Sequence, residues 1–252
     1  MGARLPDRAL ARVVAARAWR GGIAVGLPHF ARVLVLAPHP DDESLACGGT
    51  LALLSDGGAR ITVVAATDGE ASLSAGVPAG ELAHRRRAEL RAAASLLGIT
   101  DVRFLGHPDT GLHAVRGALA AQLADLLTTL RPEVVMLPWA GDDPGDHAAL
   151  NLALADGGVP ADVEIWGAEV WTPLPLNRLV DISAVLDRKR AAIAAHTTAH
   201  GAFELDALLG LNRYRSIAGL RGHGHAEAFL TCTGDRYRTL VAAAVDAPRD
   251  AE

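Results

Sequence analysis

The chain has 252 residues, half of them hydrophobic, which is enough for one α/β domain with a buried core. Its net charge of −5 gives no basic surface for nucleic acid, and no run of about 18 apolar residues predicts a membrane span. The two cysteines, Cys47 and Cys232, are too few for a disulfide framework, so we expect buried thiols in a cytoplasmic protein.

Apolar segments alternate with segments of helical periodicity along the chain. Strands are predicted near residues 32–37, 61–66, 102–105, 133–138 and 163–171, with a sixth near 178–182. Helices are predicted near 47–56, 81–97, 114–130, 147–155, 184–200 and 203–213, and loops over 71–80 and 214–226. The alternation predicts an α/β fold, a Rossmann-like and mostly parallel sheet with helices on both faces.

We expect this fold to form a single domain over residues 1–252. The core is expected at about 30–232, preceded by an N-terminal helix over 1–25 and followed by a tail at 245–252.

The most informative segment is Pro-His-Pro-Asp-Asp-Glu-Ser at residues 38–44. It follows the predicted strand at 32–37 and precedes a predicted helix, and open α/β sheets form their sites at such strand ends. Imidazole and carboxylate groups are common zinc ligands, and a neighbouring carboxylate can serve as a base toward water on the metal. The cluster therefore indicates a functional site, although either aspartate could instead cap the helix.

The sequence Pro-His-Pro-Asp-Asp-Glu at 38–43 resembles the signature of the PIG-L/LmbE family, zinc-dependent deacetylases of N-acetylglucosaminyl compounds. Further segments resemble the family in the expected order: Thr-Asp-Gly-Glu at 67–70, then 86–90, 97–98 and 104–109, then 138–147 with Gly-Asp-His at its end, then 189–196, and Ala-Glu-Ala-Phe at 226–229. The resemblance spans residues 32–230, and the first motif is its most specific part.

The resemblance implies that His39, Asp42 and His147 bind Zn²⁺. Three protein ligands leave one coordination position for water, which is the arrangement of a catalytic zinc site. It also implies that Asp41 is the general base, with Glu43 as a supporting acid behind the ligands or at the helix start.

Arg86 and Asp109 match family positions that line the sugar pocket. Taken alone, Arg86 could equally be a solvated arginine on an Arg-rich helix, and Asp109 could start a turn.

The chain departs from the family at the second metal motif. Many members have His-x-Asp-His there, and this sequence has Pro144 in place of the first histidine. That histidine helps to stabilise the oxyanion or to protonate the amine. We expect the loop 214–226 to supply a replacement, with His225 favoured over His223, Asp146 and Asp143.

The resemblance implies a zinc-dependent hydrolase that removes an N-acetyl group from an N-acetylglucosaminyl-type amino sugar, in small-molecule or antibiotic biosynthesis. An amidase of a mycothiol-like thiol conjugate is one alternative, and a catalytically degenerate sugar-binding member is another. The expected partner is a small amino-sugar substrate, with no nucleic acid and no membrane, and a homo-oligomer is left open. Iron(II) can occupy a similar ligand set.

Overall fold

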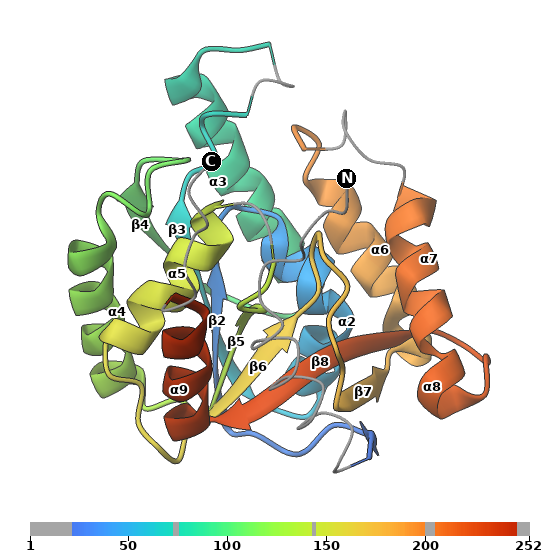
Figure 1. Cartoon of the computed structure of the whole chain (residues 1–252). Helices are drawn as coiled ribbons and strands as arrows, with labels where there is room; N and C mark the ends of the chain where they lie inside the picture. The colour runs from blue at the N-terminus through green and yellow to red at the C-terminus, as the bar shows by residue number, and fades with distance from the viewer. Residues whose placement is uncertain (1–21, 73–75, 143–144, 200–204, 246–252) are drawn as a thin grey trace, which may run out of the picture.

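The computed structural model of the protein describes residues 22–72, 76–142, 145–199 and 205–245 (Figure 1). The strands are β1 (Ala24–Val25), β2 (Arg32–Ala37), β3 (Arg60–Thr67), β4 (Asp101–His107), β5 (Val134–Pro138), β6 (Glu164–Ala168), β7 (Arg178–Asp181) and β8 (Ala226–Thr233). The helices are α2 (Asp42–Asp56), α3 (Ala79–Leu96), α4 (Arg116–Leu130), α5 (Gly145–Asp156), α6 (Leu186–Ala195), α7 (Leu205–Arg215), α8 (Ile217–Leu220) and α9 (Gly234–Val245), with a 3₁₀ turn, η2 (Ser183–Val185), before α6.

All the strands of the described residues belong to one eight-stranded sheet with the order β1-β7-β8-β6-β5-β2-β3-β4. Neighbouring strands run parallel except for β8, which is antiparallel to both β6 and β7. The predicted α/β class with a mostly parallel sheet is therefore confirmed. None of the described helices is both long enough and apolar enough to cross a membrane.

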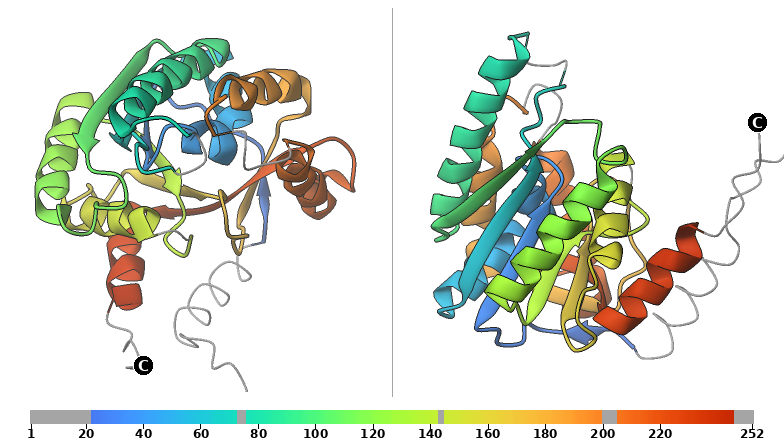
Figure 2. Two further views of the ribbon diagram at one scale, coloured as in Figure 1. Left: turned by 90° about the horizontal axis from the view of Figure 1, so that it is seen from above. Right: turned by 90° about the vertical axis from the view of Figure 1, so that its left-hand side faces the viewer.

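Helices cover both faces of the sheet, as predicted (Figure 2). Successive side chains of β2 point to opposite faces because a strand is pleated. Val33 and Val35 therefore join a core beneath α2, α3 and α6, and Leu34 and Leu36 join a second core beneath α4, α5 and α9. Burial on both faces explains why β2 appears in the sequence as a continuous apolar run.

The strand order reverses between β2 and β5. The chain proceeds from β2 outward to β3 and β4, and it then returns so that β5 pairs with the other side of β2. The following helices, α2 and α5, lie on opposite faces (Figure 1). Such a switch point opens a crevice at the carboxyl ends of the strands, and it is bordered by segments 38–42 and 139–142 and by the start of α5.

Several expected elements differ from those observed. The strand expected at 163–171 ends at Ala168, and the helix expected at 184–200 ends at Ala195. Strand β8 and helix α9 were not predicted, and the expected loop 214–226 contains α8 and the end of α7. Strand β8 depends on pairing with two distant strands, which local sequence pattern does not encode.

The expected terminal segments fall mainly outside the described residues. Of the helix expected over 1–25, only residues 22–25 are described, and they include β1 instead of a helix. Of the tail expected at 245–252, only Val245 is described, as the last residue of α9.

Helix α2 begins at Asp42, earlier than the expected 47–56, and it bends at Cys47, whose φ of −145° and ψ of 19° are not helical. The bend creates a new helix start inside α2. Glu227 of β8 accepts hydrogen bonds there from the N–H groups of Gly49 and Thr50, at 2.8 and 2.7 Å. A buried carboxylate thus caps the second part of α2 from a different layer of the fold.

Lys189 of α6 completes this connection. Its Nζ donates to Glu227 Oε1 at 2.6 Å and to the Leu45 carbonyl of the first part of α2 at 2.9 Å. Lys189 and Glu227 are each 1% exposed. The ion pair therefore joins both parts of the bent helix to α6 and β8.

We expect Glu227→Ala to lower the free energy of unfolding by about 3–5 kcal/mol, because it leaves the Lys189 ammonium buried without its anion. Urea unfolding followed by circular dichroism measures this. The double variant Lys189→Met/Glu227→Gln should lose less, because it buries no net charge. A loss below about 1 kcal/mol in Glu227→Ala, the scale of an exposed pair, would contradict a structural role for the pair.

Candidate active site

The segment after β2 folds back on itself so that its side chains converge. The His39 N–H donates to Asp42 Oδ2 at 2.9 Å, and the Asp42 N–H donates to the His39 carbonyl at 3.3 Å. Between them, Asp41 adopts a φ of 140°, which is unusual for a residue other than glycine. Strained backbone of this kind costs about 1–3 kcal/mol and is concentrated at functional sites.

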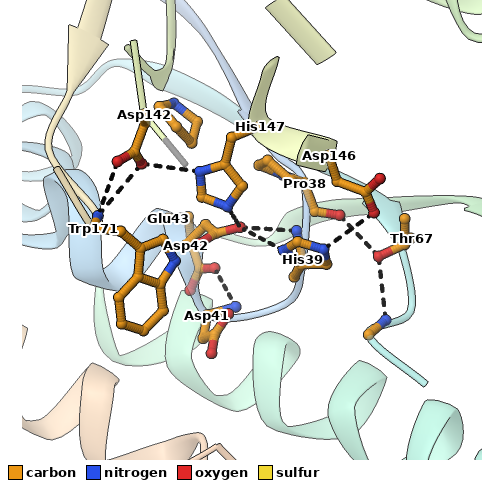
Figure 3. Close-up of polar contacts among 12 residues, drawn as sticks. Pro38, His39, Asp41, Asp42, Glu43, Thr67, Asp142, Asp146, His147 and Trp171 are labelled. Atoms are coloured by element: carbon orange, nitrogen blue, oxygen red, sulfur yellow. Dashed lines mark hydrogen bonds and ion pairs between the residues drawn. The ribbon is translucent and has the colours of Figure 1, made fainter. Parts of the chain in front are cut away.

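His39, Asp42 and His147 come together at the switch point, as Figure 3 shows. His39 Nδ1 lies 3.3 Å from Asp42 Oδ2, and His147 Nε2 lies 3.4 Å from the same oxygen. The ligand-type atoms of the three residues all lie within 4.8 Å of one another. His147 Nε2 is buried and has no hydrogen-bond partner among the described residues. An unsatisfied imidazole nitrogen beside a carboxylate and a second imidazole fits a divalent metal ion.

His147 is oriented by Asp142, a residue that no sequence motif singled out. His147 Nδ1 lies 3.0 Å from Asp142 Oδ2. The Asp142 carboxylate also accepts the N–H groups of Trp171 and Thr172, which lie beyond β6. A carboxylate on the second ring nitrogen fixes the ring so that Nε2 faces the metal position. The only sequence signal was an acid shortly after a predicted strand.

A second group of ligand-type atoms lies on the other side of the His39 ring. His39 Nε2 is 3.1 Å from Asp109 Oδ1 and 3.3 Å from Asp146 Oδ2. Asp146 also accepts the N–H groups of Thr110 and Leu112, at 2.8 and 3.1 Å. Its oxygens are therefore engaged in holding the loop after β4, which is a different role from the proton transfer considered for it.

Arg86, expected to contact the sugar, is buried beneath Asp41. Its guanidinium lies 3.2 Å from Asp41 Oδ2 and donates to the carbonyls of Gly69 and Pro40, each at 2.9 Å. Gly69 has a φ of 68°, and a Cβ there would lie 2.3 Å from the guanidinium. The close approach therefore requires glycine at position 69. Asp109 and Arg86 both contact site residues, and their contact with substrate stays a prediction.

Burial and crowding shift the pKa values of the cluster in opposite directions. Burial, together with the adjacent Asp42 carboxylate, raises the pKa of Asp41 to about 6. Burial would raise the pKa of Asp42 as well, but the two histidines hold it well below its usual range. Burial disfavours the charged form of His147, yet Asp42 and Asp142 together raise its pKa to about 9. The carboxylates of the cluster therefore favour a positively charged His147 ring in the metal-free protein.

The structure does not bring His225 to this cluster. Its N–H donates to Ser183 Oγ at 2.9 Å, and its carbonyl accepts the Ile182 N–H at 3.0 Å, so these backbone bonds tie it to the turn after β7. Burial and two arginines, Arg213 and Arg190, lower its pKa. The expectation that the loop 214–226 carries His225 over the metal is therefore corrected.

Of the other candidates for the missing histidine, Asp146 lies in the cluster but accepts backbone N–H groups there, and the remaining two are exposed or outside the described residues. His223 is exposed, and its N–H donates to the Leu220 carbonyl. Asp143 and Pro144 lie outside the described residues.

Residues 34–156 match the model of the family described as PIG-L: GlcNAc-PI de-N-acetylase. The chain is 31% identical over 186 residues to a diacetylchitobiose deacetylase of Thermococcus kodakarensis, covering 66% of this chain and 68% of that protein. It is 40% identical over 180 residues to a Bacillus cereus protein named "Probable N-acetyl-alpha-D-glucosaminyl L-malate deacetylase 2", covering 65% of this chain and 81% of that protein.

Among solved structures, the conserved protein TT1542 of Thermus thermophilus has a similar fold, with a TM-score of 0.69 and 30% identity. The match covers 79% of this chain and 94% of TT1542.

Matches to three further curated deacetylases span 44, 58 and 57% of the length of those proteins.

Metal binding should release protons and should strengthen as the pH rises. A ring nitrogen must lose its proton before it binds a metal, and the His147 pKa of about 9 means that the metal-free ring holds this proton at pH 7. We expect ZnCl₂ binding at pH 7 to release about one proton or more, with affinity falling as pH decreases below 9. Calorimetry in buffers of different ionisation enthalpy counts the protons, and a count of zero at pH 7 would contradict this electrostatic description.

Proposed function

The chain belongs to the PIG-L family, and we propose that it is a zinc-dependent deacetylase that removes the N-acetyl group of an N-acetylglucosaminyl-type amino sugar. The observation that carries the proposal is the convergence of His39, Asp42 and His147 beside the buried Asp41. Two curated relatives, matched along 68 and 81% of their length, are named as a diacetylchitobiose deacetylase and a probable N-acetyl-alpha-D-glucosaminyl L-malate deacetylase.

His39 Nδ1, Asp42 Oδ2 and His147 Nε2 would hold the metal ion. Zinc, when bound, polarises the amide carbonyl as a Lewis acid and lowers the pKa of water to about 7. Zinc is preferred because two imidazoles and one carboxylate match its common catalytic ligand sets.

Asp41 acts as the general base in this proposal. It accepts a proton from water as the water oxygen attacks the acetyl carbonyl, and a tetrahedral intermediate forms. Because burial and Asp42 raise its pKa to about 6, the protonated carboxyl can then return that proton to the nitrogen as the C–N bond breaks. The products are acetate and the free amine, and one carboxyl group supplies both proton transfers.

If Asp41 returns the proton to the nitrogen, the reaction does not need the histidine that many family members have at position 144. Arg86 positions Asp41 for this role, because its guanidinium contacts Asp41 Oδ2 and donates to the carbonyl of the preceding residue, while its charge lowers the pKa of Asp41 against the effects of burial and Asp42. Asp109 is proposed to contact the sugar, since its carboxylate lies 3.1 Å from His39 Nε2 at the same site.

The experiment is acetate release from N-acetylglucosamine and diacetylchitobiose by the zinc-loaded protein, with zinc counted in the same samples. Asp41→Asn should keep stoichiometric zinc and lose about 10²–10⁴-fold in turnover, the usual contribution of a general base. His147→Ala should lose zinc and activity together, because it removes a ligand.

The two variants separate the outcomes. Normal turnover in zinc-loaded Asp41→Asn would exclude the base assignment, and full zinc in His147→Ala would remove this histidine from the ligand set. If the parent protein binds zinc and sugar but releases no acetate, the chain is instead a catalytically degenerate sugar-binding member of the family.

A further inference from the structure

We propose that Glu43 and His196 form a positioning pair that holds Asp41 in its strained backbone conformation. The pair would keep the Asp41 carboxylate directed toward the attacking water. The inference rests on the deacetylase proposal, in which Asp41 is the base. Neither Glu43 nor His196 is expected to touch substrate, because they are 1% and 2% exposed.

Asp41 needs support from outside its own backbone. It is the residue directly before α2, and its φ of 140° and ψ of −26° are unfavourable for a residue other than glycine. The carbonyl of Asp41 accepts the first helical bonds of α2, from the N–H groups of Ser44 and Leu45 at 3.1 and 3.0 Å. The carbonyl is therefore fixed by the helix, and a separate acceptor must hold the N–H.

Glu43 provides that acceptor. Its Oε2 lies 3.2 Å from the Asp41 nitrogen, the contact drawn between the two residues in Figure 3. The other oxygen, Oε1, accepts the Ser44 hydroxyl at 2.5 Å and faces His196 Nε2 at 3.1 Å. One buried carboxylate thus connects the Asp41 peptide to an imidazole more than 150 positions away in the chain.

His196 is itself held in place by α3. It is the residue directly after α6, and the helix stops there. The next two residues, Thr197 and Thr198, bind Glu89 of α3 through both hydroxyls and the Thr198 N–H, at 2.5–3.0 Å. These bonds fix the chain as it leaves α6 and direct the His196 ring toward Glu43.

The pair differs from ordinary helix capping in one respect. A carboxylate in the first turn of a helix is commonly exposed and interacts with the helix dipole. Glu43 is instead enclosed and matched by a buried imidazole, which a capping role alone does not require. Buried charge is costly unless it is paired, so His196 offsets the cost of enclosing the Glu43 carboxylate next to Asp41.

The test compares His196→Met with His196→Gln. The two new side chains have nearly the same length and volume, but only glutamine can donate to Glu43 Oε1. We expect His196→Met to lower kcat about 10- to 100-fold, the scale of losing a second-layer hydrogen bond at a metal site, with KM and bound zinc unchanged. His196→Gln should keep most of the turnover. Equal kcat values in the two variants would overturn the proposal.

A double-mutant cycle with Asp41→Asn shows whether His196 acts through Asp41. If it does, His196→Met causes little further loss once Asp41 has been replaced. A full additive loss in the double variant would overturn the proposal. The matched control is Lys189→Met/Glu227→Gln, which removes the buried pair between α6 and β8 that also contacts α2, and it should lose stability without the kcat loss of His196→Met.

Crystal structures of the His196→Met and His196→Gln variants test the pair without any activity. Asp41 should leave its positive φ in the methionine variant and keep it in the glutamine variant. An unchanged Asp41 in both variants would overturn the positioning role. If the parent protein releases no acetate, the deacetylase proposal fails, and this comparison still decides the structural claim.

Discussion

Five aspartates are gathered around two imidazoles in a site that is largely closed to water: Asp41, Asp42, Asp109, Asp142 and Asp146. Buried carboxylates are unfavourable unless each is paired or hydrogen-bonded, and much of the local structure meets this requirement. Backbone N–H groups from the loops after β2, β4 and β6 donate hydrogen bonds to these carboxylate oxygens. The histidines and Arg86 also offset the negative charge of these carboxylates. A divalent cation between His39 and His147 would offset more of it.

The fold places this cluster and also restrains it. Reversal of the strand order between β2 and β5 brings two distant segments to one crevice. The antiparallel strand β8 contributes no ligand, yet its Glu227 caps the bent helix that carries Asp42. Two polar contacts also join α6 to this helix: Lys189 donates to the Leu45 carbonyl, and His196, the residue after α6, faces Glu43. The ligand segment is therefore short and locally strained, but it is fixed by β8 of the sheet and by the neighbouring helix α6.

The sequence predicted the parts of this arrangement that depend on local pattern. Apolar runs predicted the parallel strands, and the strand-end cluster at 38–43 predicted His39, Asp42 and, through its resemblance, His147. Contacts between distant segments were not predictable in the same way. Asp142 was not singled out, the segment 189–196 did not indicate that His196 faces Glu43, and β8 depends on pairing with β6 and β7. His225 was misplaced because a glycine-rich segment suggested mobility, whereas its backbone is bonded to the turn after β7.

The two candidate metal positions around His39 allow one decisive measurement. Anomalous diffraction at the zinc edge from crystals of the zinc-loaded protein locates the ion directly. We expect one peak at about 2.0–2.2 Å from His39 Nδ1, Asp42 Oδ2 and His147 Nε2, in the space that the unsatisfied His147 nitrogen faces. A peak instead between His39 Nε2, Asp109 and Asp146, or no ordered zinc at either position, would contradict the proposed metal site.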